Sequence, residues 1–389
     1  MTVLRDAIVV VLVLSAMGAA QDDGASATGL EGLLGPDVVW ARDIQSDVQT
    51  LCSEPFGGRA GAALPVVRDW LENRMRGCGL LPVGGRYRQP FALSGRRGVN
   101  LYGLLPATDR GPDSVPAPGY LVLGAHYDHL GKPGGRLHPG AADNAAGVAA
   151  LLSVARQLGL RNRDRAILFV FFDLEEAGLL GSEAFVRAPP LPLDDCRWAL
   201  SCDILGRPAL GLLDDWLFVQ GWEWTPGILA DLETLRTKTP QRLGLFRTEI
   251  AGDRSDFVAF RNRGVPHLFF TTGEFEGYHG PEDLASTLDY PALLAQARFL
   301  TTCASHLASR RDRESFADVA ASQLVEYADL EALARGIAQL PADRVPAERA
   351  RQALALAARA RLVLDRGEVH DDDRAWLMSV GRDLGRRLR

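Results

Sequence analysis

The pattern of apolar and polar positions divides the chain into an α/β region followed by an all-helical region. Residues 39–80 show helical spacing, interrupted by the Gly-rich stretch EPFGGRAGA, and the spacing returns at residues 144–158 and 290–310. Continuous apolar runs rich in β-branched residues predict strands at residues 99–105, 119–125, 166–172, 198–202 and 267–271. The segment between the first two strands is rich in Pro, Gly and Asp and predicts a hairpin.

The alternation of these strands with helices predicts the fold class. Strands that are apolar throughout, such as AILFVFF, are typical of a sheet buried on both faces. We therefore expect an α/β fold with a mixed, mainly parallel central sheet sandwiched by helices. Beyond Arg311 the strand pattern stops, and an Ala-, Leu- and Arg-rich region predicts two to four helices packed on the domain or on a partner.

The N-terminus has the pattern of an export signal. Arg5 precedes an apolar run at residues 7–20, which is short for a membrane span and ends in small residues followed by QDDG. This predicts a cleavable signal peptide at residues 1–20 and export to the periplasm or the extracellular space, with an uncleaved membrane anchor as the alternative. A flexible linker at residues 21–38, an α/β domain at 39–310 and an α-helical extension at 311–389 complete the expected organisation.

Composition narrows the class of protein without naming a function. A chain of 389 residues with 47% hydrophobic residues is globular, which excludes a disordered, collagen-like or coiled-coil molecule. The 43 basic and 49 acidic residues are too balanced to indicate a nucleic-acid partner or a stable membrane partner. Five scattered cysteines do not form a disulfide framework in a chain of this length. Cys196 and Cys202 could pair locally, although small buried side chains are the favoured interpretation.

Ionisable residues follow the predicted strands at several places. Open α/β sheets bind ligands beyond the carboxyl ends of their strands, so these side chains are expected to meet. Taken singly, each has an ordinary structural explanation, such as a helix N-cap or a solvated turn. Their joint occurrence favours a metal site. The candidates are His126 in GAHYDHLG, Asp143 in HPGAADNAAG, Glu175 and Glu176 in FFDLEEAGLLGSE, Asp203 in LSCDILGRP, and His279 in GYHGPEDL.

The chemistry of zinc explains why this set would be needed. Zinc prefers imidazole and carboxylate ligands, and two zinc ions require a bridging carboxylate plus roughly two terminal ligands each. Asp128 follows His126 by two residues and is suited to hold the imidazole in its ligating tautomer. Adjacent side chains in extended backbone diverge, so one member of the Glu175 and Glu176 pair can bind metal while the other takes a proton from water.

With these residues in view, the chain resembles the secreted zinc-dependent aminopeptidases of metallopeptidase family 28, the co-catalytic dizinc exopeptidases. The resemblance implies the three-layer zinc-exopeptidase fold, which is phosphorylase/hydrolase-like, two zinc ions, and peptide substrates with a free N-terminus. Residues 39–310 would then be the catalytic domain, whereas the C-terminal helices are not a feature of the core family. The matching blocks, in the family's order from about Ser53 to Leu307, are SEPFGGRAGA, GVNLYGLLP, GAHYDHLG, PGAADNAAG, DLEEAGLLGSEAF, CDILGR, SDFVAF, GVPHLFF and YHGPEDL.

Carried over residue by residue, the resemblance implies a ligand set. Asp143 would bridge the two metals. His126 and Asp203 would complete one site, and Glu176 and His279 would complete the other.

The resemblance also implies roles around the ligands. Glu175 would be the general base that acts with a zinc-bridged hydroxide, and Asp128 would orient His126. Tyr278 occupies a position that polarises the scissile carbonyl in some members, and Asp283 would support the site as an acidic residue near the last histidine.

Departures from the family pattern concern specificity more than chemistry. Ala142 replaces an Asp or Asn of the GADDNASG-type block, and Phe257 replaces the His of an SDH-like segment. His267 replaces a small apolar residue and fits the core better than a specificity pocket, because it begins an apolar strand. His129 and His138 flank the site and receive no role.

Two other functions remain open at this point. Glutaminyl cyclases share the fold, use a single zinc and cyclise N-terminal Gln without water, whereas this chain retains all five ligands expected for two zinc ions. A catalytically inactive scaffold that binds partners, or itself, through the C-terminal helices is the third alternative.

Overall fold

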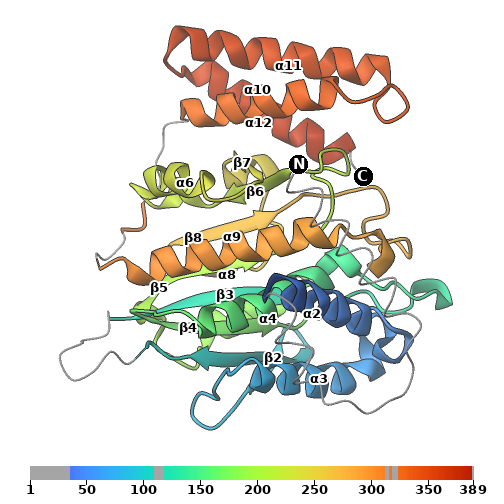
Figure 1. Cartoon of the computed structure of the whole chain (residues 1–389), viewed down its shortest axis with the longest axis vertical. Helices are drawn as coiled ribbons and strands as arrows, with labels where there is room; N and C mark the ends of the chain where they lie inside the picture. The colour runs from blue at the N-terminus through green and yellow to red at the C-terminus, as the bar shows by residue number, and fades with distance from the viewer. Residues whose placement is uncertain (1–35, 109–117, 312–314, 318–322, 388–389) are drawn as a thin grey trace.

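The computed structural model describes residues 36–108, 118–311, 315–317 and 323–387 (Figure 1). The expected signal peptide and most of the expected linker lie outside these residues. Among the helices within these ranges, none has the length and apolarity needed to cross a membrane.

One mixed sheet of eight strands forms the centre of the fold, in the order β1-β2-β4-β3-β5-β8-β6-β7. The four strands β4, β3, β5 and β8 run parallel, whereas β2 and β6 flank them in the antiparallel direction. The predicted mixed, mainly parallel sheet is therefore confirmed. The strands are β1 (Arg88–Leu93), β2 (Arg96–Leu105), β3 (Tyr120–His126), β4 (Ala166–Phe172), β5 (Cys196–Cys202), β6 (Trp216–Gln220), β7 (Arg242–Leu245) and β8 (His267–Thr271).

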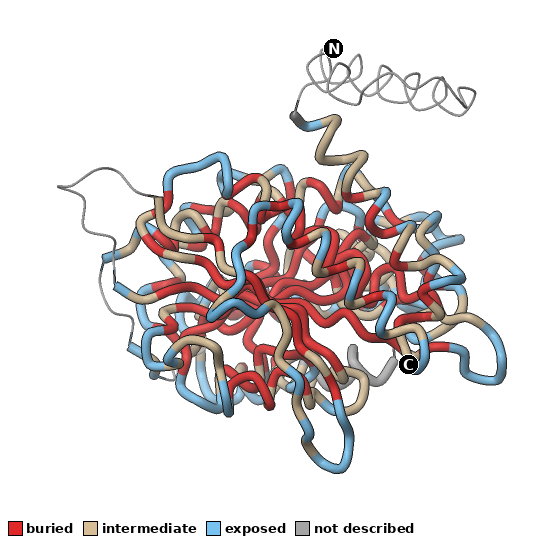
Figure 2. The backbone as a smooth tube through the Cα atoms, turned by 90° about the horizontal axis from the view of Figure 1, so that it is seen from below, coloured by how far each residue is buried: buried red, intermediate tan, exposed pale blue. Residues whose placement is uncertain are grey.

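Helices cover both faces of this sheet, as the apolar strands require. Along β4, Phe169 and Phe171 belong to the hydrophobic cluster of one face, and Leu168 and Val170 to the cluster of the other. Buried residues accordingly concentrate in the middle of the molecule (Figure 2). The first face is covered by α2 (Pro36–Leu51), α3 (Leu64–Gly77), α4 (Ala146–Gly159), α6 (Ile228–Arg236) and α9 (Tyr290–Ser309), and the second by α5 (Leu180–Arg187) and α8 (Phe257–Arg261).

The strand order places a ligand-binding crevice at β3. From β3 the chain passes to β4 on one side, and then returns across to β5 on the other side. Such a switch point opens a crevice outside the carboxyl ends of the parallel strands. The sequence motifs with ionisable residues follow these same ends.

The structure corrects one connection and adds three strands. Strands β2 and β3 do not form the predicted hairpin, because both pair with β4 and lie on opposite sides of it. The intervening residues 109–117 lie outside the described part of the chain. The strands that were not predicted, β1, β6 and β7, are four to six residues long. In β1, at the edge of the sheet, no residue is fully buried, and partly buried and exposed residues largely alternate. Such short segments give little periodic signal.

The described C-terminal residues form three helices, in agreement with the two to four that were expected. They are α10 (Leu324–Ala338), α11 (Ala347–Arg366) and α12 (Asp371–Arg387). Tyr327 and Leu330 of α10 and Leu377 of α12 share a hydrophobic cluster with Trp216 and Phe218 of β6. Figure 1 shows these helices stacked beyond the end of the sheet that β6 and β7 form. The shared cluster places them against side chains of β6 that α5 and α8 do not reach.

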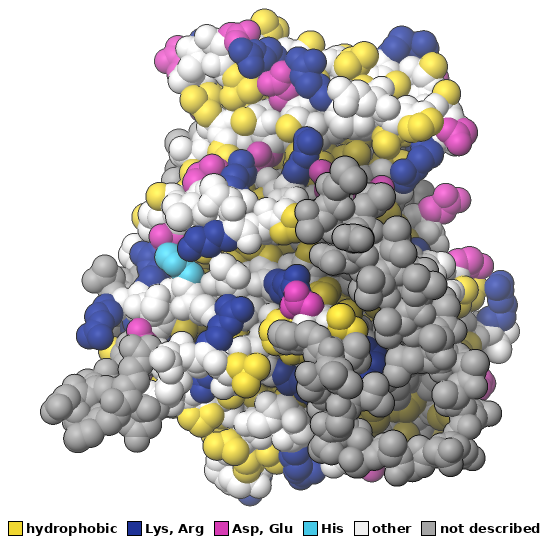
Figure 3. Space-filling model, in the orientation of Figure 1, with side chains coloured by type: hydrophobic (Ala, Val, Ile, Leu, Met, Phe, Trp, Pro, Cys, Tyr) yellow, Lys and Arg dark blue, Asp and Glu magenta, His cyan; other side chains and the backbone are white. Residues whose placement is uncertain are grey.

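The charge distribution on the surface agrees with the balanced composition. On the described part of the face in Figure 3, basic and acidic side chains are interspersed.

All five cysteines are free thiols. Cys196 and Cys202 occupy opposite ends of β5, about 20 Å apart at the strand rise, whereas a disulfide requires Cα atoms within about 7 Å. The local pairing is therefore wrong, and four of the five thiols are small buried side chains.

The buried Glu326 makes the docking of α10 sensitive to pH. Its carboxylate accepts a hydrogen bond from the backbone N–H of Gln323 at 2.9 Å, and its side chain is fully buried. Burial raises the pKa of Glu326 to about 8 from its ordinary value of 4.5. A group with a higher pKa in the folded chain contributes stability that is complete below about pH 4.5 and is lost as the pH rises through about 8.

We therefore expect Glu326→Gln to stabilise the protein at high pH. Gln keeps an acceptor for the helix cap and carries no charge to bury, so the free energy of unfolding should exceed that of the wild type by about 1–3 kcal/mol at pH 9 and by little at pH 5. Urea unfolding at both pH values measures the difference. The exposed Glu348→Gln in α11 is the control, and an equal effect of the two substitutions would contradict this role for Glu326.

Candidate metal centre

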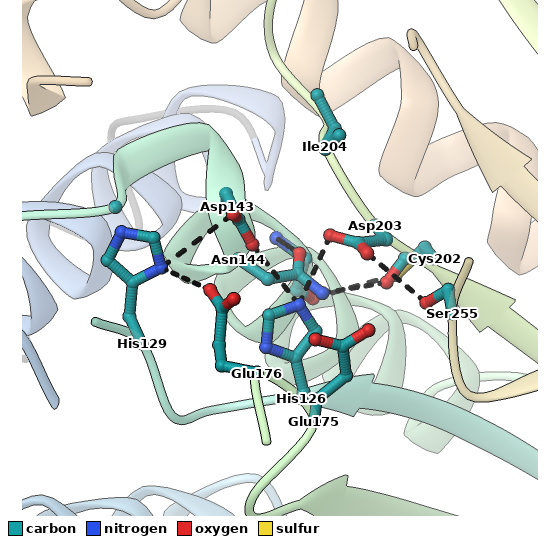
Figure 4. A network of polar contacts seen from close by, with 12 residues as sticks. His126, His129, Asp143, Asn144, Glu175, Glu176, Cys202, Asp203, Ile204 and Ser255 are labelled. Carbon is teal, nitrogen blue, oxygen red and sulfur yellow. Dashed lines mark hydrogen bonds and ion pairs between the residues drawn. The ribbon is translucent and has the colours of Figure 1, made fainter. Parts of the chain in front are cut away.

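The side chains expected to bind metal converge at the carboxyl ends of the parallel strands (Figure 4). They arrive from five places in the fold, so residues far apart in the sequence become neighbours. His126 is the last residue of β3, Glu175 and Glu176 follow β4, Asp203 follows β5, His279 lies in the loop after β8, and Asp143 precedes α4.

Asp143 lies between two groups of these side chains. Its Oδ1 atom is 3.2 Å from Nε2 of His126, which is in turn 3.3 Å from Oδ1 of Asp203. Its Oδ2 atom is 3.1 Å from Nε2 of His279, which is 3.2 Å from Oε2 of Glu176. One carboxylate thus faces an imidazole and a carboxylate on each side.

These separations fit ligands of a metal ion. Zinc binds His nitrogen and carboxylate oxygen at about 2.0–2.2 Å, and two such ligands at the tetrahedral angle lie roughly 3.3 Å apart. Oδ2 of Asp143 is buried and, although Nε2 of His279 lies 3.1 Å away, it accepts no hydrogen bond within the described residues, as expected of an oxygen and a nitrogen that share a cation. Both halves of the site therefore have the ligand types and the spacing that zinc requires.

The tautomer of His126 agrees with this assignment. Its Nδ1 atom lies 3.2 Å from the backbone carbonyl of Asp128, which can only accept a hydrogen bond, so Nδ1 carries the proton. Nε2 then has a free lone pair directed toward Asp143 and Asp203. A ligating histidine is commonly fixed in this way.

The electrostatics of the centre favour a cation. Burial, together with Asp203, Asp256 and Asp143, raises the pKa of Glu175 well above its ordinary value. Burial also raises the pKa of Asp203, where neighbouring carboxylates add to the effect of desolvation. So many carboxylates repel one another when they are ionised together, and divalent cations would offset that repulsion.

Asp128 supports the two glutamates as well as His126. Its Oδ1 atom is 3.7 Å from Nδ1 of His126, which is too long for a hydrogen bond. The carboxylate instead accepts from the backbone N–H groups of Glu175, at 3.1 Å, and of Glu176, at 3.4 Å. Asp128 therefore contacts His126 through its carbonyl and fixes the glutamate turn through its carboxylate.

Asp283 holds the loop that presents the central carboxylate. It is fully buried, and its oxygens accept from the backbone N–H groups of Ala142, at 3.0 Å, and of Asp143, at 3.1 Å. Residue 142 contributes its backbone to this contact. The replacement of an acidic or amide side chain by Ala142 therefore leaves the contact intact.

Tyr278 and His138 fix the position of His279. The ring of Tyr278 stacks on the imidazole of His279 with centroids 3.9 Å apart, and Nδ1 of His138 donates to the carbonyl of His279 at 3.0 Å. His279 has a left-handed backbone (φ 59°), as do Leu174 and Ile204 beside Glu175 and Asp203. Non-glycine residues in this region cost free energy and cluster at functional sites.

His129 is a site residue that the sequence left without a role. Its buried imidazole donates from Nδ1 to Oε1 of Glu176 at 2.7 Å, because an ionised carboxylate can only accept. This separation is shorter than those between the candidate ligands, as expected for a hydrogen bond. His129 thus fixes the oxygen of Glu176 that does not face His279. In GAHYDHLG nothing distinguishes it from a solvated loop residue.

Arg59 of the Gly-rich stretch is a second residue that was not anticipated. Its buried guanidinium donates to backbone carbonyls only, among the hydrogen bonds of the described residues. The acceptors are the carbonyls of Tyr127 at 2.9 Å, Leu51 at 3.4 Å, Pro139 at 2.5 Å, Gly140 at 2.9 Å and Asp143 at 2.9 Å. Arg59 therefore ties the loop after β3 to the loop that contains Asp143.

His267 belongs to the core, as its sequence context suggested. It is fully buried at the start of β8, at the opposite end of the strand from the metal centre. Its imidazole stacks on Phe257 with centroids 5.6 Å apart, and burial lowers its pKa to about 3.

Comparisons with known proteins identify relatives over part of the chain. Residues 105–303 match the family model described as Peptidase family M28. An aminopeptidase of Bacillus subtilis, YwaD, is 27% identical over 52% of this chain and 44% of its own length. An aminopeptidase of Pseudomonas aeruginosa is 31% identical over 46% of this chain and 32% of its own. The chain thus spans less than half the length of these relatives.

Solved structures share the fold at low sequence identity. The Legionella pneumophila LapA aminopeptidase is 18% identical, with a TM-score of 0.57 over 76% of this chain and 79% of that protein. The Porphyromonas gingivalis glutaminyl cyclase is 20% identical, with a TM-score of 0.54 over 67% of this chain and 96% of that protein. The fold alone therefore does not separate peptide hydrolysis from cyclisation.

Removal of the His129 imidazole is expected to weaken one half of the centre. His129→Ala frees the Glu176 carboxylate to rotate, so zinc affinity at the Glu176 and His279 half should fall by about 10–100-fold, with little change at the other half. Titration with a competing chelator measures the two affinities separately. His129→Gln restores a donor and should recover part of the loss. Equal affinities in wild type and His129→Ala would contradict the role.

Replacement of Arg59 is expected to weaken both halves. Lysine has three donors in place of five, so Arg59→Lys leaves buried carbonyls unpaired and should cost about 2–4 kcal/mol in the free energy of unfolding of the metal-free protein. Zinc affinity should fall at both halves, because both depend on Asp143. Urea unfolding and zinc titration test this. The exposed Arg161→Lys is the control, and unchanged stability in Arg59→Lys would refute the role.

Proposed function

The chain belongs to peptidase family M28, and from that premise we propose that it is an aminopeptidase that uses two zinc ions to remove the N-terminal residue of peptides. The observation on which this rests is the position of Asp143, whose two oxygens each face a histidine paired with a second carboxylate. Export to the periplasm or the extracellular space is part of the proposal, on the strength of the apolar run at residues 7–20.

The five ligands divide between the two metals. His126 and Asp203 would hold one ion, Glu176 and His279 the other, and Asp143 both. Bound zinc supplies Lewis-acid chemistry, which polarises a carbonyl and lowers the pKa of water.

Glu175 is the proposed general base. It adjoins the ligands but makes no hydrogen bond to them among the described contacts, and a carboxylate oxygen of Glu175 lies within 4.8 Å of ligand atoms of His126 and Asp203. Its backbone is fixed by Asp128, so its carboxylate can take a proton from the attacking water and deliver it to the leaving amine. The acidic neighbours that raise its pKa favour its holding that proton between the two steps.

Tyr278 is the proposed donor to the substrate carbonyl. Its ring lies against His279, beside the centre, and burial together with the surrounding carboxylates raises the pKa of its hydroxyl. The phenol therefore keeps its proton and can donate a hydrogen bond to an oxygen that gains negative charge.

The second candidate function is that of a single-zinc glutaminyl cyclase, because a cyclase shares this fold. The structure favours hydrolysis, since the half with His126 and Asp203 is as well formed as the half with Glu176 and His279. An inactive scaffold is disfavoured on the same ground, because every expected ligand is present and in contact with a neighbour.

Substitution of Glu175 tests the function. Glu175→Gln should lower kcat on leucine arylamides by about 10²–10⁴-fold while leaving about two zinc ions bound per chain. Turnover assays with zinc and with chelator, together with metal analysis, measure both quantities. Glu183→Gln, a partly exposed residue in α5, is the control.

Three results would overturn the proposal. They are near-normal turnover by Glu175→Gln, cleavage of N-blocked peptides in preference to free N-termini, and one zinc per chain with cyclisation of N-terminal Gln.

A further inference from the structure

The C-terminal helices border a cavity that reaches the metal centre. The cavity has a volume of about 150 Å³. Its lining includes Asp203, a candidate metal ligand, and Tyr278, the neighbour of the candidate ligand His279. The lining also includes Leu330 and Leu333 of α10 and Leu377 of α12, which belong to one hydrophobic cluster. Helices α10 and α12 supply no candidate metal ligand, but they form part of the wall of a cavity that adjoins the metal centre.

The walls of this cavity are largely apolar. Aromatic rings also line it, contributed by Phe218 of β6, Phe246 after β7 and Phe269 of β8. In another protein, an apolar cavity of about 150 Å³ binds benzene, so this space can take one isobutyl or benzyl group. An occupant of that size would remove the apolar walls from water.

Two carboxylates line the cavity, and both have a partner: Asp203 faces His126 at the metal centre, and Glu274 is paired with a guanidinium. Arg254 and Glu274 also line it and form an ion pair. Because the carboxylate of Glu274 is already paired with a guanidinium, it offers little attraction to a cationic side chain. A Lys or Arg side chain would also lose its hydration against the aromatic walls. Charge and size therefore point to the same class of occupant.

We propose that α10 and α12 form the end wall of the pocket that receives the side chain of the N-terminal substrate residue. The pocket selects large apolar residues, such as Leu, Met and Phe. This inference rests on the proposed aminopeptidase function, because a substrate whose first carbonyl lies at the metal centre has its first side chain next to Asp203 and Tyr278. The helical extension is then a specificity element of the catalytic site.

Changes at Leu333 test the end wall without touching the metal centre. Leu333→Trp fills the cavity and should lower kcat/KM for Leu and Phe arylamides on the order of 10–200-fold, while Ala arylamide changes by less than about threefold. Leu333→Ala deepens the cavity and should raise the ratio of Phe to Leu turnover. Ile337→Ala removes a partly buried side chain of α10 that does not line the cavity, and it should leave all ratios unchanged.

A binding measurement provides a readout that does not depend on turnover. In the Glu175→Gln background, calorimetry compares Leu-Gly with Ala-Gly, and Leu-Gly should bind more tightly. Adding Leu333→Trp should abolish this preference while metal analysis shows unchanged zinc. If Leu333→Trp does not fold, Leu333→Ala gives the same comparison with Phe-Gly and Leu-Gly.

The outcomes separate this inference from the function on which it rests. If the wild type cleaves free N-termini but both Leu333 variants keep the wild-type ratios, the pocket assignment is wrong and the aminopeptidase stands. A wild-type preference for N-terminal Arg or Lys would also overturn the assignment. If zinc-loaded wild type cleaves no substrate with a free N-terminus, the proposed function fails, and the calorimetric preference alone then decides whether the pocket is real.

Discussion

The hydrogen bonds of the Arg59 guanidinium are the interaction on which the metal centre depends most. A buried guanidinium is costly unless each N–H finds an acceptor, and carbonyls in irregular loops are costly unless they find a donor. Arg59 meets both requirements at once, since it joins the carbonyl of Tyr127 to those of Gly140 and Asp143. The loop after β3 and the loop before α4 are therefore fixed relative to each other, which places Asp143 opposite His126.

The fixed backbone gives the carboxylates of the site two different roles. Asp128 and Asp283 direct their oxygens to backbone N–H groups. Asp143 and Asp203 instead direct oxygens to the histidines. A carboxylate that already accepts backbone hydrogen bonds has fewer lone pairs to offer a metal. The same residue type thus serves as support in one position and as candidate ligand in another, and backbone geometry decides which.

Site residues marked by a local sequence pattern could be predicted, whereas residues and strand pairings that depend on long-range packing could not. His126 and Asp203 were identifiable because each lies at the end of a largely apolar predicted strand, and parallel strands bring their carboxyl ends together. Arg59 was not, because its acceptors are irregular loop carbonyls as far as 84 residues away, and no periodicity marks them. His129 was missed because its partner, the carboxylate of Glu176, is 47 residues away in the sequence. The false hairpin between β2 and β3 arose because turn-rich composition indicates a reversal but not which strand is paired next.

The C-terminal helices link the stability of the sheet to the choice of substrate. Strands β6 and β7 extend the sheet beyond the reach of α5 and α8, so Trp216 and Phe218 need another apolar layer against them. Helices α10 and α12 provide it, but the layer does not fill the space completely, and the remaining cavity opens toward Asp203. If that cavity receives the substrate side chain, the residues that complete the core also limit the size of the substrate. Selection for stability and selection for specificity then act on the same positions, such as Leu330 and Leu333.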